Sequence, residues 1–158
     1  MRSYPAPDLV RLNHIGITVN DLDRSIALFT TCFGFSVTSR GGRPPGMAAR
    51  LTGVVGAEIE IAFVERSGLI IELLAFTPRQ TDAAFLPPNH TGAAHVALDV
   101  PAIATVLEQG HRLGLRILGE VVQIPAGPNK GGRVAYVRQD TGLTLELIET
   151  AEKPVDKL

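Results

Sequence analysis

Apolar and polar residues alternate first near the start of the chain. Residues 12–19 divide between two faces, Ile15, Ile17 and Val19 on one and His14, Gly16 and Thr18 on the other. This two-residue period predicts a half-buried strand. Apolar side chains at helical spacing then predict a helix over residues 22–33, which Asp21 caps at its start and Gly34 ends.

The rest of the first half is rich in strand and turn signals. We expect a strand over residues 35–39 and a Gly/Pro loop over residues 41–46. Two further apolar segments, 57–65 and 69–76, are separated by Arg66-Ser67-Gly68. That spacing predicts two antiparallel strands joined by a tight turn.

The same order of elements recurs in the second half. Residues 94–100 alternate as the first strand does, and Pro101 suits the first turn of a helix that ends at Gly110. The expected elements after this helix are a strand near 118–124, a loop over 125–132, and a closing hairpin of strands 133–139 and 143–149.

The chain is therefore predicted to be an α+β protein of two βαβββ modules in one integrated domain. The modules span residues 11–76 and 92–150, and a linker rich in Pro and Thr spans residues 77–91. Strands linked by hairpins favour mixed or antiparallel sheets over a doubly wound parallel sheet.

Two histidines and two glutamates occupy matching places in the two modules. His14 and His95 lie in the first strand of each module, and Glu72 and Glu146 lie in the last. Their neighbours are apolar, and burying an uncompensated carboxylate costs several kcal/mol or more. A divalent ion would compensate both carboxylates. Imidazole with carboxylate suits Zn, Ni, Co, Mn or Fe(II) better than Ca²⁺.

Each of these four residues, taken singly, has an ordinary explanation. A lone His or Glu in a strand is usually on the solvated face or is satisfied by a neighbour. The metal hypothesis depends on the symmetry of the four, because independent surface residues have no reason to repeat between modules.

These segments resemble the vicinal oxygen chelate superfamily, which includes glyoxalase I, methylmalonyl-CoA epimerase, extradiol dioxygenases and the bleomycin and fosfomycin resistance proteins. The resemblance spans about residues 11–149. It implies two βαβββ modules whose strands form a curved mixed sheet around a metal-binding cup. It also implies a homodimer and one divalent ion. The segments that carry the resemblance are 14–26 with Phe29 and Gly34, 92–100, and 136–149 with Asp140-Thr141-Gly142.

Two enzyme branches fit the order His14, Glu72, His95, Glu146. Bacterial glyoxalase I has the same order of ligands, and the segment Lys130-Gly131-Gly132 resembles the one before its closing hairpin. However, Thr18 and Phe76 stand at the two positions where that enzyme carries the residues that contact glutathione. Methylmalonyl-CoA epimerase has the same module layout but usually carries Gln at the place of Glu72.

Two other branches remain as alternatives. An extradiol-type dioxygenase would use Tyr136 as a catalytic residue, but the helper His expected near Gly127 is absent. As a fourth ligand, Glu72 would also occupy a coordination position on the metal that oxygen needs. A bleomycin-resistance-like protein would bind a drug without catalysis, but such members carry no metal of their own.

The function that we predict is a metal-dependent lyase or isomerase acting on a small oxygenated substrate. It would transfer a proton next to an oxygen that the metal binds. Glu146 and Glu72 are the candidate bases, and Tyr136, Lys130 and Thr18 the candidate substrate contacts.

Charge and cysteine content limit the kinds of binding partner and the cell compartment that we expect. Fifteen basic and sixteen acidic residues give a net charge of −1 without a basic stripe, so we expect neither nucleic acid nor an anionic membrane as partner. The single cysteine excludes an intrachain disulfide, and no apolar run reaches membrane-spanning length. We therefore expect a protein of the reducing cytoplasm.

Overall fold

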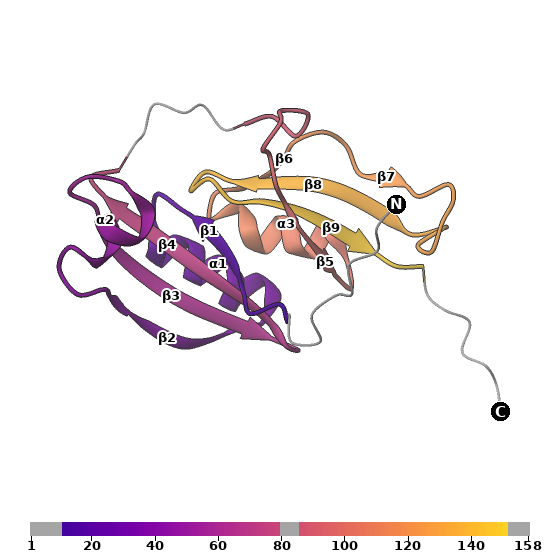
Figure 1. The fold of residues 1–158 in the computed structure, drawn as a ribbon. Helices are drawn as coiled ribbons and strands as arrows, with labels where there is room; N and C mark the ends of the chain where they lie inside the picture. Colours follow the sequence, from indigo (N-terminus) through magenta and orange to yellow (C-terminus); the bar gives the residue numbers. More distant parts are fainter. Residues whose placement is uncertain (1–10, 80–85, 152–158) are drawn as a thin grey trace.

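The computed structural model describes residues 11–79 and 86–151 (Figure 1). The first module forms a four-stranded sheet in the order β1-β4-β3-β2. β1 runs parallel to β4, and the other pairs are antiparallel. The strands are β1 (Ile15–Thr18), β2 (Ser36–Gly42), β3 (Glu58–Arg66) and β4 (Leu69–Thr77).

The second module repeats this arrangement. Its sheet has the order β5-β9-β8-β6, with β7 also paired to β8, and β5 is parallel to β9. The predicted α+β class with βαβββ modules is confirmed, and pairing stays within each module, so the strands form two sheets. The strands are β5 (Val96–Asp99), β6 (Leu115–Ile117), β7 (Val122–Gln123), β8 (Arg133–Gln139) and β9 (Thr144–Glu149).

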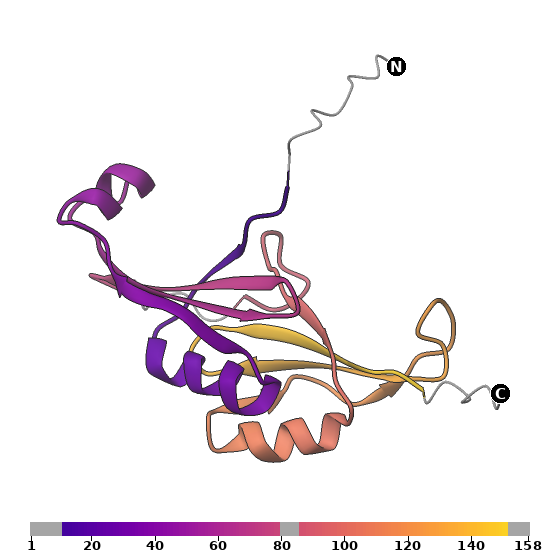
Figure 2. The same cartoon turned by 90° about the horizontal axis from the view of Figure 1, so that it is seen from below.

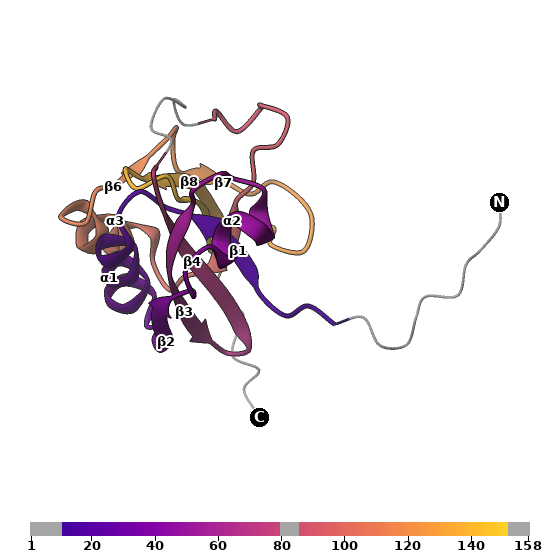
Figure 3. The ribbon, with the colours of Figure 1, turned by 60° about the vertical axis from the view of Figure 1, so that its left-hand side comes forward.

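The two long helices cover the same side of the two sheets. α1 (Leu22–Phe33) and α3 (Ile103–His111) lie together below the strands in Figure 2 and on one side of them in Figure 3. α1 begins and ends as predicted. The Asp21 carboxylate accepts a hydrogen bond from the Arg24 N–H, and Gly34 adopts a left-handed φ of 64°.

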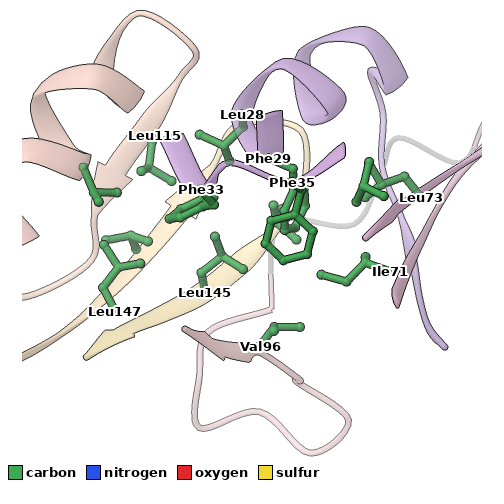
Figure 4. Packing of buried hydrophobic residues seen from close by; sticks show 14 of the residues in the cluster. Leu28, Phe29, Phe33, Phe35, Ile71, Leu73, Val96, Leu115, Leu145 and Leu147 are labelled. Carbon is green, nitrogen blue, oxygen red and sulfur yellow. The ribbon is translucent and has the colours of Figure 1, made fainter. Parts of the chain in front are cut away.

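A single hydrophobic core joins the modules. The helix residues Phe29 and Phe33 belong to the same buried cluster as Leu145 and Leu147 of β9 (Figure 4). These β9 side chains point away from Glu146, because neighbours in a strand alternate between faces. The face of the second sheet that carries Glu146 is therefore the one not packed in this core.

A buried polar network also crosses between the modules. The Thr141 hydroxyl donates to Gln139 Oε1 at 2.7 Å, and the Ser25 hydroxyl of α1 donates to Thr141 Oγ1 at 3.0 Å. Gln139 Nε2 donates to the carbonyls of Arg24 and Leu113. Since all these groups have partners, their hydrogen bonds offset the cost of burying them, and the network fixes α1 against the β8–β9 turn.

Several elements differ from the prediction, and β2 extends to Gly42, into the predicted loop. A helix, α2 (Met47–Thr52), follows the Gly/Pro loop and had no counterpart in the prediction. Its six residues, between glycines at positions 46 and 53, are too few to show helical periodicity. The strand predicted near 118–124 is instead divided between β6, which begins at Leu115, and the short β7. α3 includes Gly110 and ends one residue later.

The predicted linker is partly described. Thr77 belongs to β4, and residues 80–85 lie outside the described residues. In the described part of the chain, no helix is long and apolar enough to cross a membrane.

Gly110 permits close packing between α3 and β6. A Cβ atom at Gly110 would lie 2.6 Å from Leu115 Cδ2 and 2.9 Å from Leu115 Cβ. Gly110→Ala should therefore lower the free energy of unfolding by roughly 1 kcal/mol, although Ala favours helices. Urea denaturation measures the change. Gly119→Ala, where a Cβ meets nothing within 4 Å, is the control and should be neutral. Equal stability of both variants would contradict the packing argument.

The network around Gln139 should make the modules unfold together. Gln139→Leu leaves two carbonyls and the Thr141 hydroxyl without their partner, which should cost at least about 2 kcal/mol. Thermal melting of this variant should keep one transition at a lower temperature. Gln123→Leu, on the exposed β7, should melt like wild type. Separate transitions for the two modules in the wild-type protein would refute the coupling.

Candidate metal centre

The first module holds a histidine and a carboxylate against each other. His14 Nε2 lies 3.2 Å from Glu72 Oε2. His14 immediately precedes β1, and the parallel pairing sets Gly16 opposite Glu72. On the other side of β4, Phe63 of β3 is opposite Glu72, and its ring meets the His14 ring edge-on at 5.6 Å.

The second module repeats this arrangement with one substitution. His95 Nε2 lies 3.0 Å from Glu146 Oε2. Ala97 is opposite Glu146 on β5, as Gly16 is opposite Glu72 on β1. Tyr136 takes the place of Phe63, and its Oη lies 3.3 Å from His95 Nε2.

The spacing within each pair is that of two neighbouring ligands of one ion. Imidazole nitrogen and carboxylate oxygen bind first-row divalent ions at about 2.0–2.2 Å, so ligands at right angles lie roughly 3 Å apart. The His14–Glu72 and His95–Glu146 distances, 3.2 and 3.0 Å, both match. The Glu72 side chain is 12% exposed and that of Glu146 22%, so neither carboxylate is fully hydrated.

The four predicted ligands form two pairs within one chain. Among the described residues, no three His, Cys, Asp or Glu side chains converge as a metal site requires. Each pair therefore supplies half of the four-residue set. That all four hold one ion stays a prediction.

The Tyr136 hydroxyl is within hydrogen-bonding distance of His95 at the second pair. Burial, together with the charge of Glu146, raises the pKa of the Tyr136 phenol above the ordinary value of 10.0. The phenol therefore keeps its proton at neutral pH. Beside Tyr136 and His95 lies a cavity of about 170 Å³, which Arg138 and Thr144 also line.

Arg43 is a site residue that the sequence prediction missed. Its Nη2 lies 3.5 Å from Glu72 Oε1, on the carboxylate oxygen that does not face His14. Arg43 belongs to the loop after β2, two strands away from β4. The approach of Arg43 to Glu72 depends on the register of β2 with β3 and of β3 with β4. No local sequence pattern reveals these registers.

The other predicted contacts lie farther from the pairs. Thr18 is exposed at the end of β1, and alternation puts it on the same face as Gly16. Lys130 is exposed in the loop before β8, and within the described residues it forms no hydrogen bond or ion pair with His95 or Glu146. Both remain predictions as substrate contacts.

Curated relatives include lyases and an epimerase. A putative lactoylglutathione lyase of Brassica oleracea is 29% identical over 154 residues, which cover 96% of this chain and 48% of that protein. The chain thus spans about half the length of that relative. A 2-epi-5-epi-valiolone epimerase of an Actinomyces species is 32% identical, over 90% of this chain and 80% of that one. A lactoylglutathione lyase of Salmonella typhimurium is 29% identical, over 90% and 95%.

Solved structures share the fold. A glyoxalase family protein from Bacillus cereus superposes with a TM-score of 0.77 at 28% identity, over 94% of this chain and 99% of that one. The fosfomycin resistance protein FosX of Listeria monocytogenes, complexed with Mn(II) and sulfate, gives 0.57 at 16% identity, over 91% and 95%. At that identity the second likeness concerns the fold alone.

The family model confirms the resemblance inferred from the strand and site pattern. It matches residues 11–147, which include both His–Glu pairs and every strand except the last two residues of β9. The chain belongs to the Glyoxalase/Bleomycin resistance protein/Dioxygenase superfamily.

Proposed function

We propose that this protein is a divalent-metal-dependent lyase or isomerase of the glyoxalase or epimerase type, acting on a small oxygenated substrate. The observation that carries the proposal is the repeated pair of imidazole and carboxylate, at 3.2 Å in one module and 3.0 Å in the other. The lyases and the epimerase among the relatives support this reaction class.

The complete centre forms between two copies of the chain. Each pair supplies two ligands, and within the described residues no third His, Cys, Asp or Glu joins either pair. The core packs against the opposite faces of β4 and β9, which leaves both pairs accessible to another subunit. The first pair of one subunit and the second pair of its partner together provide two imidazoles and two carboxylates.

This ligand set suits proton transfer better than oxygen chemistry. Four protein ligands leave about two positions on an octahedral ion, enough for two neighbouring substrate oxygens. A divalent ion bound there would act as a Lewis acid and acidify the adjacent C–H bond. Glu146 or Glu72 would accept the proton on release from the ion when the substrate chelates, because the freed carboxylate would be both close and basic. Tyr136 donates a hydrogen bond to the developing oxygen charge.

An extradiol-type dioxygenase is the second candidate. The Tyr136 hydroxyl lies 3.3 Å from His95 Nε2. A phenol at this position could take part in the dioxygenase reaction as well as in proton transfer. Glu72 weighs against this candidate because a fourth protein ligand leaves no position for oxygen beside a bidentate substrate.

Mixing two defective variants tests the shared centre. One variant carries His14→Ala with Glu72→Ala, and the other carries His95→Ala with Glu146→Ala. Each alone should bind almost no metal, because its centres keep only half of their ligands. The purified heterodimer of the two variants should bind one ion, because one of its two centres then has all four ligands.

Elemental analysis measures the metal content, and circular dichroism verifies folding. The doubly substituted variant Arg40→Ala with Thr105→Ala, which changes no ligand, should bind metal like wild type. A heterodimer as empty as its parents would show that the two pairs do not meet across subunits. Full metal occupancy in either parent would show that the altered pair is not a ligand pair.

Exchange of hydrogen at the substrate carbon tests the reaction class. In D₂O without oxygen, the metal-loaded protein should introduce deuterium next to the chelated oxygens of its substrate. The panel to examine by NMR is a 2-oxoaldehyde hemithioacetal, an acyl-CoA epimer pair and a catechol. Glu146→Gln or Glu72→Gln should slow the exchange roughly 100-fold or more, because the base is lost, and should retain some metal.

Two results would contradict this class. Turnover that requires dissolved oxygen and yields a ring-opened catechol would identify a dioxygenase. A metal-free wild-type protein that binds a large planar drug would identify a binding protein without catalysis.

A further inference from the structure

Arg43 is held rigidly beside the first pair. Its backbone N–H donates to the carbonyl of Ile59 at 3.3 Å. Pro44 and Pro45 follow directly, and a proline restricts both its own φ and the residue before it. The Met47 N–H closes the turn onto the Pro44 carbonyl at 3.0 Å. The start of the Arg43 side chain is therefore fixed before any ligand arrives.

The guanidinium of Arg43 is only loosely engaged with Glu72. The distance from Nη2 to Oε1, 3.5 Å, exceeds the 2.7–2.9 Å typical of a charge-assisted hydrogen bond. Among the described residues, Glu72 is the one side chain with which this guanidinium forms an ion pair or hydrogen bond. Arginine carries five N–H donors, and this side chain is 39% exposed. Most of its donors thus remain for a ligand at the mouth of the first pair.

Arg43 also distinguishes the two halves of the proposed centre. At the second pair the phenol of Tyr136 lies beside His95, and Arg138, which lines the same cavity, donates to Thr144 Oγ1 and to the Leu86 carbonyl. The matching position at the first pair holds the ring of Phe63. The first pair therefore obtains its donor from a cation instead.

The charges at the complete centre favour an anion. Two carboxylates, Glu72 and Glu146, neutralise a divalent ion, and Arg43 then leaves a net positive charge, to which Arg138 of the cavity beside the second pair adds. A guanidinium matches a carboxylate with two parallel N–H···O bonds, a geometry that neutral oxygens do not satisfy equally.

We propose that Arg43 is the residue that selects an anionic substrate, a small 2-hydroxy or 2-oxo carboxylate. The inference rests on the proposed metal centre and names its substrate class. The carboxylate lies against the guanidinium, and the vicinal oxygen lies toward Tyr136. Arg43 recognises this acid and is not needed to hold Glu72 in place.

Lactate and lactamide are matched probes, since they share a shape and differ in charge. With the Mn(II)-loaded protein, the relaxation of their methyl protons reports binding near the ion. Wild type should bind lactate at least about tenfold more tightly than lactamide. Arg43→Met should lose this preference through weaker lactate binding. It should also bind Mn(II) as tightly as wild type or more so, because a positive charge has been removed from beside the ion.

Arg40→Met is the control. Arg40 lies three residues away, and its guanidinium pairs with Asp23 and Glu60 and has no contact with Glu72. This variant should keep both the lactate preference and the Mn(II) affinity of wild type.

Two outcomes would overturn the role of Arg43. If Arg43→Met lowers Mn(II) affinity tenfold or more, as loss of a residue that orients a ligand does, Arg43 positions Glu72 instead. If Arg43→Met retains the lactate preference, Arg43 does not recognise the anion. Both outcomes leave the metal centre standing, whereas a wild-type protein that binds none of Mn(II), Zn, Ni, Co and Fe(II) would refute the proposed function itself.

Discussion

The parallel pairing of the first and last strand in each module is the constraint on which the site depends. It sets Gly16 opposite Glu72 and Ala97 opposite Glu146, and it brings the preceding histidine to the carboxylate. Parallel neighbours need a long crossover between them. That crossover begins with α1 in one module and α3 in the other. The same connection that creates the His–Glu pair thus supplies the helix that covers the opposite face.

The burial of the modules explains where the pairs are found. Leu145 and Leu147 of β9 are fully buried in the core shared with Phe29 and Phe33, so Glu146 between them faces the other way. The same alternation applies to Glu72 between Ile71 and Leu73. A chain that packs its modules through these apolar faces cannot at the same time hide its polar pairs in that core.

Local patterns predicted much of this fold, and long-range registers account for the rest. Alternation and capping identified β1, α1 and the hairpin strands, because each depends on neighbours a few residues away. The repeat of His and Glu singled out the four residues that form the two pairs, and their binding of one ion stays a prediction. The sequence pattern did not reveal their separation within one chain, α2, or the approach of Arg43 to Glu72. The last of these depends on the pairing of β2 with β3 and of β3 with β4, including the irregular register between Val37 and Ser39.

The exchange of Phe63 for Tyr136 at matching positions breaks the pseudo-symmetry that the repeated strands give to the two pairs. The two modules present the same pair of donors, yet one pair is flanked by a hydrocarbon ring and the other by a hydroxyl group. The donor beside the first pair is the guanidinium of Arg43, whereas the group beside the second is a neutral phenol. A molecule that reached both pairs would therefore have one favourable orientation of two, so a nearly symmetrical scaffold gains a direction.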